Sequence, residues 1–150
     1  MEMFWSNLTR LTGFPAEIFI LILILIMAGR KNWRRIAITL SAFILFRLAG
    51  EIIKETVASP RVCWQIGIKT LIPCPDSFAF PSGHALGAAM VAMIINLIYR
   101  RKLVLISVWA TTLLVAASRV AVGVHSPIDV IGGMIMGAAA GWIIWKFYWV

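Results

Sequence analysis

Five long apolar runs constrain what this chain can fold into. They cover about residues 12–29, 36–53, 83–99, 103–124 and 128–150, and each is near the roughly 20 residues that a helix needs to cross a bilayer. Hydrophobic residues make up 61% of the 150 positions and the mean hydropathy is +0.93, which excludes an ordinary soluble globule. The sequence therefore predicts an all-α polytopic membrane helix bundle with five transmembrane helices, in a single domain over residues 1–150.

Basic residues predict how this bundle is oriented. They gather at residues 30–35, at residues 100–102 and at Lys146, in segments that would all lie on one side of the bilayer. The positive-inside rule makes that side the cytoplasm, so the N-terminus is expected outside and the C-terminus inside. The six acidic residues fall at or toward the outer side. The net charge of +8 is then an orientation signal and a contact for anionic lipids, and it is too dispersed to indicate nucleic-acid binding.

Three segments carry further patterns: residues 1–11, the second apolar run and the last apolar run. Residues 1–11, with Phe4, Trp5 and Leu8 at helical spacing, predict a short amphipathic helix that anchors the chain in the outer interface. In the second apolar run Arg47 and Glu51 lie four residues apart, which favours a structural ion pair, although Glu51 is also close enough to the outer surface to orient the cations of a site. In the last run Gly133, Gly137 and Gly141 predict close helix packing rather than chemistry.

The connection over residues 54–81 is too long for a passive link and is expected to cover a functional site on the outer side. It holds both cysteines of the chain, Cys63 and Cys74, which make a poor zinc site because no histidine is near them. An extracytoplasmic position permits a disulfide, and free thiols are the alternative. We take the disulfide as the hypothesis; it would hold Arg61 in place.

The pentad Phe80-Pro81-Ser82-Gly83-His84 stands immediately before the third apolar run. Pro81 and Ser82 are helix start signals, and the N-terminus that they begin offers N–H groups and a positive dipole end to an anion. His84 adds a group that can give or take a proton near neutral pH. An ordinary capped helix with a histidine facing water is the alternative interpretation.

Four separate pieces of the chain place polar chemistry at the same predicted membrane face. They are Lys54 with Arg61, Ser82 to His84, Ser118 with Arg119, and His125 with Asp129. Three cations and a helix N-terminus can hold the oxygens of a phosphate, while two histidines can divide the roles of nucleophile and acid. Asp129 can accept one imidazole N–H of His125, or it can serve only as the acid of a capping box at the helix start.

At these residues the sequence resembles the type 2 phosphatidic acid phosphatase superfamily, which also includes vanadium haloperoxidases and bacterial acid phosphatases. The family pattern is a lysine, six residues and Arg-Pro, then Pro-Ser-Gly-His, then Ser-Arg, five residues, His, three residues and Asp. Residues 54–129 match every spacing, with one departure: the proline precedes Arg61, as Pro60, instead of following it. The resemblance covers about residues 54–150. Membrane members of the family usually have six spans, so the first family helix is expected to be reduced here.

The resemblance implies a role for each matched residue. His125 would be the nucleophile that forms a phosphohistidine, Asp129 its orienting partner, and His84 the acid that protonates the leaving group. The phosphate would be held by Lys54, Arg61, Ser82, Gly83 and Arg119. No metal and no cofactor are implied, because the cations neutralise the charge that a metal would otherwise neutralise.

A site at the outer surface suits a lipid phosphate as substrate, hydrolysed on the periplasmic side of a bacterial inner membrane. The compact chain looks most like the small enzymes that remove the 1-phosphate of lipid A, and undecaprenyl diphosphate and phosphatidylglycerophosphate are the alternative substrates. A transporter with a proton relay is a more distant alternative. A relay would need charges distributed through the depth of the bilayer, whereas all those considered except Arg47 gather at one face. The oligomeric state is not determined by the sequence.

Overall fold

A computed structural model describes residues 1–12, 22, 33–65, 67 and 69–149 of the chain. In this described part the regular elements are all helical, and no strand is present. The α-helices are α1 (Glu2–Leu11), α3 (Trp33–Val57), α4 (Gly83–Tyr99), α5 (Lys102–Ala121) and α6 (Pro127–Trp149), and a short 3₁₀ helix, η1 (Val62–Trp64), follows α3. The predicted all-α class is confirmed for these residues.

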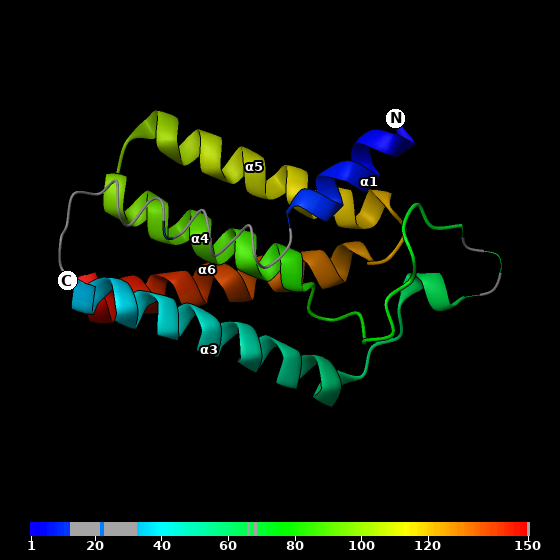
Figure 1. The fold of residues 1–150 in the computed structure, drawn as a ribbon, viewed down its shortest axis with the longest axis horizontal. Helices are drawn as coiled ribbons and strands as arrows, with labels where there is room; N and C mark the ends of the chain where they lie inside the picture. The colour runs from blue at the N-terminus through cyan, green and yellow to red at the C-terminus, as the bar shows by residue number, and fades with distance from the viewer. Residues whose placement is uncertain (13–21, 23–32, 66, 68, 150) are drawn as a thin grey trace.

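The four long helices lie side by side as a bundle (Figure 1). Helix α4 contacts α3, α5 and α6, and its contact with α6 is the most extensive in the described chain. The short helix α1 packs against α5 near the end of the bundle where α5 finishes. The α3–α4 connection, with η1, extends beyond this same end (Figure 1). This end of the bundle is therefore covered by α1 on one side and by the long connection on another.

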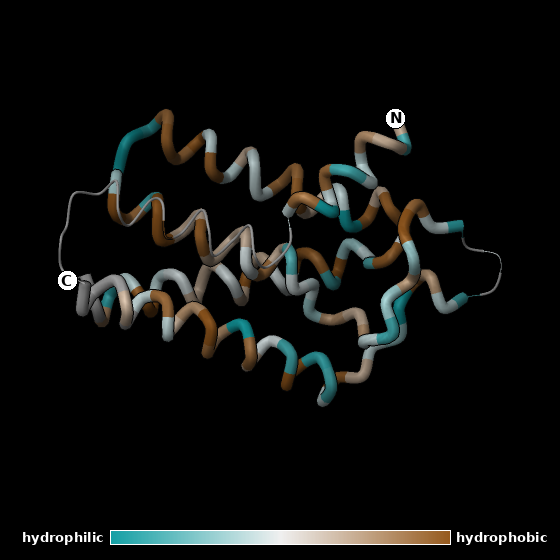
Figure 2. The backbone as a smooth tube through the Cα atoms, viewed as in Figure 1, coloured by the Kyte–Doolittle hydropathy of each residue, from teal (hydrophilic) through white to brown (hydrophobic). Residues whose placement is uncertain are grey.

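Apolar side chains are found both inside and outside the bundle. A buried cluster that includes Phe43, Met90, Ile94 and Ile144 joins α3, α4 and α6. Large apolar side chains such as Leu45 on α3 are nevertheless exposed. Figure 2 shows hydrophilic segments at the α4–α5 connection at one end and at the end of α3 at the other, with mostly apolar helix between them. This distribution is the one that a bilayer selects, because lipid-facing side chains need no burial in protein.

Glycines allow α6 to lie directly on the backbone of α4. An added Cβ would come within 2.6 Å of the Ser82 carbonyl oxygen at Gly133, and within 2.0 Å of the Leu86 carbonyl oxygen at Gly137. The same substitution at Gly141 would reach the carbonyl oxygen of Met90 at 2.6 Å. Contacts this short leave no room for a side chain, so the prediction that these glycines serve packing is confirmed.

Two helices among the described residues are long and apolar enough to cross a membrane. They are α5, over Lys102–Ala121, and α6, over Pro127–Phe147; Gly83–Tyr99 is apolar but shorter. Helix α3 has 25 residues and carries charged groups in its last turns. The first predicted span, residues 12–29, lies outside the described residues except for Thr12 and Ile22. The count of five transmembrane helices therefore stays a prediction.

Candidate active site

The predicted site residues are carried by the ends of four helices and by the connections between them. Lys54 lies in the last turn of α3, Ser82 is the N-cap of α4, Arg119 lies in the last turn of α5, and Asp129 lies in the first turn of α6. These four helix ends meet at the same end of the bundle (Figure 1). The structure therefore brings together the four pieces of sequence that were expected to converge.

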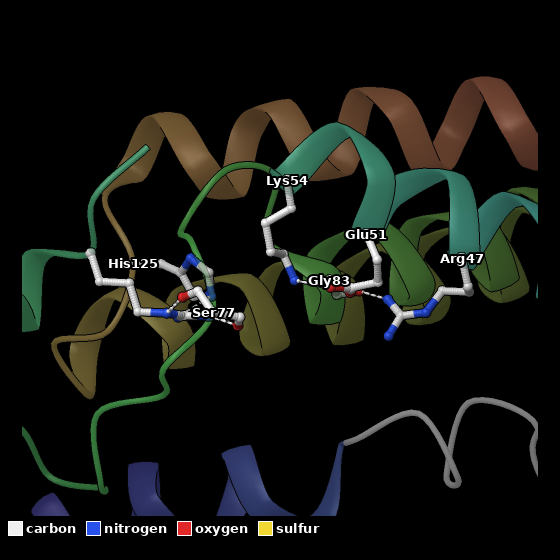
Figure 3. A network of polar contacts seen from close by, with 7 residues as sticks. Arg47, Glu51, Lys54, Ser77, Gly83 and His125 are labelled. Atoms are coloured by element: carbon white, nitrogen blue, oxygen red, sulfur yellow. Dashed lines mark hydrogen bonds and ion pairs between the residues drawn. The ribbon is translucent and has the colours of Figure 1, made fainter. Parts of the chain in front are cut away.

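Three charged side chains of α3, those of Arg47, Glu51 and Lys54, lie beside the start of α4 (Figure 3). The Lys54 ammonium group, on a residue that is only 5% exposed, contacts the Glu51 carboxylate at 2.7 Å. The Arg47 guanidinium donates a hydrogen bond to the carbonyl oxygen of Gly83. Glu51 thus orients a cation of the site, as the sequence suggested, and Arg47 fixes the first turn of α4.

Arg61 is buried although it lies in a connection. Its Nε donates to the Ser77 carbonyl oxygen, its Nη2 donates to Ser77 Oγ at 2.9 Å, and its Nη1 donates to the Val124 carbonyl oxygen at 3.2 Å. The same Nη1 lies 3.2 Å from Nε2 of His125. Burial lowers the pKa of the Arg61 guanidinium, and the Asp129 carboxylate opposes that shift. The one departure from the family pattern, Pro60 before Arg61, therefore leaves the Arg61 guanidinium in contact with His125.

A disulfide joins Cys63 to Cys74, with a Cα–Cα distance of 6.0 Å. The two cysteines lie between Arg61 and its hydrogen-bond partner Ser77 in the sequence, so the disulfide cross-links the loop that joins these two residues. A second link ties the two arms of the connection together, because the Ala79 N–H donates to the Ser59 carbonyl oxygen at 2.8 Å. The connection is therefore cross-linked on both sides of Arg61, by the hydrogen bond at Ser59 before it and by the disulfide at Cys63 after it.

Ser82 is the N-cap of α4, but its side chain does not cap the helix. The hydroxyl oxygen is buried and has no hydrogen-bond partner among the described residues, while the backbone N–H donates to the Asp129 carbonyl oxygen at 2.9 Å. An ordinary capping serine would use its hydroxyl on the N–H groups of the first turn. The first turn of α4 therefore keeps its N–H groups and the Ser82 hydroxyl available for an anion.

His125 lies between α5 and α6 and is 4% exposed. Its Nδ1 is 3.7 Å from Oδ2 of Asp129, an oxygen that also accepts the Ser126 N–H at 2.7 Å. The Asp129 N–H donates in turn to the Ser126 hydroxyl at 3.3 Å, which completes a capping box. The capping-box interpretation of Asp129 is therefore confirmed, whereas the predicted hydrogen bond from the imidazole of His125 to Asp129 is not formed at this distance.

The electrostatic surroundings of His125 favour its neutral form. Burial lowers the pKa of His125 well below its usual value, and the positive charges of Arg61 and Arg119 lower it further. A neutral imidazole keeps a lone pair on one nitrogen, which a nucleophile requires. His84, half-buried in the first turn of α4, lies within the reach of the charges on Arg47, Arg61 and Arg119.

Arg119 has a contact that the sequence did not indicate. Its Nη1 donates to Thr9 Oγ1 of α1 at 3.0 Å, and Thr9 Oγ1 also lies 3.0 Å from Ser118 Oγ. The pattern of residues 1–11 predicts an anchor and gives no indication of Thr9, because contacts across about a hundred residues leave no local signal. Ser77 was missed for the same reason, since nothing near it in sequence marks it as the partner of Arg61.

Comparison with known proteins agrees with the fold. The sequence profile of the PAP2 superfamily matches residues 35–150. Phosphatidylglycerophosphatase B of Bacillus subtilis is 32% identical over an alignment 149 residues long. The alignment covers 89% of this chain and 70% of the relative. The chain belongs to the PAP2 superfamily.

Two further comparisons extend this result. An undecaprenyl-diphosphatase of Sulfolobus acidocaldarius is 34% identical over 110 residues, or 72% of this chain, and the match spans about half, 53%, of that relative. The crystal structure of the transmembrane PAP2-type phosphatidylglycerolphosphate phosphatase of Bacillus subtilis superposes with a TM-score of 0.77 at 28% identity, over 97% of this chain and 75% of that one. The helical bundle is thus the fold of a membrane phosphatase of this superfamily.

Proposed function

We propose that residues 1–150 form a membrane-embedded lipid phosphatase domain that hydrolyses a phosphomonoester or diphosphate of a membrane lipid. The observation that carries the proposal is a pair of buried polar atoms without a hydrogen-bond partner among the described residues: Ser82 Oγ and Arg119 Nε. They come from the start of α4 and the last turn of α5, which meet at one end of the bundle, beside the buried cations Lys54 and Arg61. Unpartnered buried polar groups next to an excess of positive charge suit a polyanionic ligand.

The residue roles follow from this placement together with the family resemblance. Lys54, Arg61, Ser82, Gly83 and Arg119 bind the phosphate oxygens. His125 attacks through Nε2, since Nδ1 faces Asp129 and that carboxylate favours a proton on Nδ1. His84, which has no carboxylate beside it in sequence, protonates the leaving group.

The proposed reaction has two steps. In the first step Nε2 of His125 bonds to phosphorus, the bond from phosphorus to the lipid oxygen breaks, and His84 gives its proton to that oxygen. In the second step His84 takes a proton from water, the resulting oxygen bonds to phosphorus, and the P–N bond breaks to release phosphate. Arg61, 3.2 Å from Nε2, is placed to stabilise the negative charge on the transferred group in both steps.

The proposal includes no metal and no cofactor. Within the described residues no three His, Cys, Asp or Glu side chains gather in an arrangement that could hold a metal ion. The positive charge that phosphoryl transfer requires is available instead from Lys54, Arg61 and Arg119. Added chelator is therefore expected to leave the rate unchanged.

The test is release of inorganic phosphate by the purified protein from a panel of lipid phosphates. The panel contains lipid A 1-phosphate, the substrate that the sequence resemblance favours, together with undecaprenyl diphosphate and phosphatidylglycerophosphate, which the names of the relatives support. We expect turnover of at least one of these lipids, without added metal and in the presence of a chelator. No phosphate release from any of them would overturn the proposed function.

We also propose that the site lies on the outer side of a bacterial inner membrane, with the C-terminus in the cytoplasm. The site end of the bundle is opposite the α4–α5 connection that carries Arg100 and Arg101, and basic connections stay in the cytoplasm. The exposed residues Lys69 and Arg101 report on the two sides. An impermeant thiol reagent applied to intact cells should label Lys69→Cys and should label Arg101→Cys only after permeabilisation.

The native cysteines should not interfere with this labelling, because they are joined to each other. The opposite labelling pattern would place the site in the cytoplasm and would require a substrate lipid of the inner leaflet.

A further inference from the structure

Helix α1 contributes a buried hydroxyl to the candidate active site. Among the residues of α1, all of which the structure describes, Thr9 alone is buried, and it is 4% exposed. Phe4, which belongs to the predicted apolar face, is exposed instead. The side of α1 that packs on α5 therefore includes a polar residue, and a polar group is buried at such a contact only where it finds partners.

The hydrogen atoms of this contact can be assigned, because each hydroxyl has only one. Ser118 Oγ lies 2.6 Å from the Val115 carbonyl oxygen, which can only accept, so Ser118 donates its hydrogen there. Ser118 Oγ must then accept the hydrogen of Thr9 Oγ1 at 3.0 Å. Thr9 Oγ1 has a lone pair left, and it accepts an N–H of Arg119 Nη1 at 3.0 Å. One chain of hydrogen bonds thus runs from Arg119 through Thr9 to the backbone of α5.

We propose that Thr9 is a positioning residue for Arg119, and that α1 completes the phosphate site from outside the four-helix bundle. Thr9 occupies Nη1 of the guanidinium, whereas Nε is buried and has no partner among the described residues. Because the hydrogen bond to Thr9 fixes Nη1, the planar guanidinium is held in one orientation, and its Nε stays in position to donate to a phosphate oxygen. This inference rests on the proposed function, since it assigns Arg119 to phosphate binding.

Removal of the Thr9 hydroxyl should weaken phosphate binding by releasing Arg119. Hydrogen bonds to charged groups contribute enough that we expect Thr9→Val to lower kcat/KM on a nitrophenyl phosphate about 10- to 100-fold. Inhibition by orthovanadate, a phosphate analogue, should weaken by a similar factor, because Arg119 would contact both ligands. Valine has nearly the shape of threonine, so packing of α1 on α5 is preserved.

Three variants separate positioning from a general effect on the fold. Thr9→Ser keeps the hydroxyl and should stay within about 3-fold of the wild type. Thr12→Val is the matched control, because the acceptors of the Thr12 hydroxyl among the described residues are carbonyl oxygens of α1, those of Leu8 and Thr9. It should leave both constants unchanged. In an Arg119→Ala background Thr9→Val should have no further effect, since no guanidinium remains to be held.

The experiment measures kcat/KM and, separately, direct binding of orthovanadate by calorimetry. Unchanged constants in Thr9→Val, or an equal loss in Thr9→Ser, would overturn the role of Thr9. If the wild type releases phosphate from no substrate, the proposed function fails, but vanadate binding by the variants still decides whether Thr9 positions Arg119. A wild type that binds no vanadate would overturn the inference as well, because Arg119 would then have no anion to meet.

Discussion

Replacing His125 with alanine should abolish turnover and phosphoenzyme formation for every substrate, whereas the loss in His84→Ala should depend on the leaving group. His125 is buried, its pKa is lowered and its Nε2 lies 3.2 Å from Arg61, so in the proposed reaction no other group can take its place as nucleophile. A general acid contributes about 10²- to 10⁴-fold, and it matters most when the leaving oxygen is a poor one. A lipid alkoxide is a poor leaving group and a nitrophenolate is a good one.

The measurement compares both variants on a lipid phosphate and on a nitrophenyl phosphate, and quantifies acid-labile phosphohistidine after rapid quenching. His84→Ala should lose most of its rate on the lipid and much less on the nitrophenyl ester. The chain has only these two histidines, so a phosphohistidine found in His84→Ala must be at position 125. A phosphoenzyme in His125→Ala, or an equal loss on both substrates in His84→Ala, would show that the roles are wrongly assigned.

The sequence could indicate most of this site because its elements are encoded locally. Arg119, His125 and Asp129 are separated by one helix end and a short connection, so their spacing in sequence fixes their placement in space. Glu51 and Lys54 are likewise three residues apart on one helix, which is the spacing of a helical ion pair. The membrane class followed from hydropathy alone, because a bilayer imposes both the length and the composition of a span.

The remaining contacts are set by tertiary packing and leave no local pattern. Thr9 and Arg119 are 110 residues apart, and only the docking of α1 on α5 brings them together. Arg47 has an acidic neighbour one turn away, yet it reaches the Gly83 carbonyl oxygen on another helix. The sequence predicts Glu51, four residues away, as the partner of Arg47, because a charge in a membrane helix needs a partner. The structure adds the backbone carbonyl of Gly83, which helical spacing cannot reveal.

The Gly137→Ala variant should be strongly destabilised, although alanine is the better helix former. The added Cβ would lie 2.0 Å from the Leu86 carbonyl oxygen and 2.9 Å from its carbonyl carbon. These are backbone atoms of α4 that no side-chain rotation can move aside, so α4 and α6 must separate. We expect a loss of about 3 kcal/mol in the free energy of unfolding, which is the upper end for overpacked cores.

Gly50→Ala on α3 is the matched control, because its Cβ would also meet Leu86, but at 3.0 Å from Cδ1, the flexible end of that side chain. Both substitutions gain about the same helix propensity, roughly 1 kcal/mol, so the difference between them isolates the cost of the backbone contact. Unfolding by dodecyl sulfate in mixed micelles measures both free energies. Activity should fall with stability only in Gly137→Ala. His84 lies in the first turn of α4 and His125 lies just before α6, so separation of the two helices moves one histidine away from the other. Equal stability of the two variants would mean that α4 and α6 do not meet backbone to backbone, and that something other than their glycine contact holds the two histidines at one site.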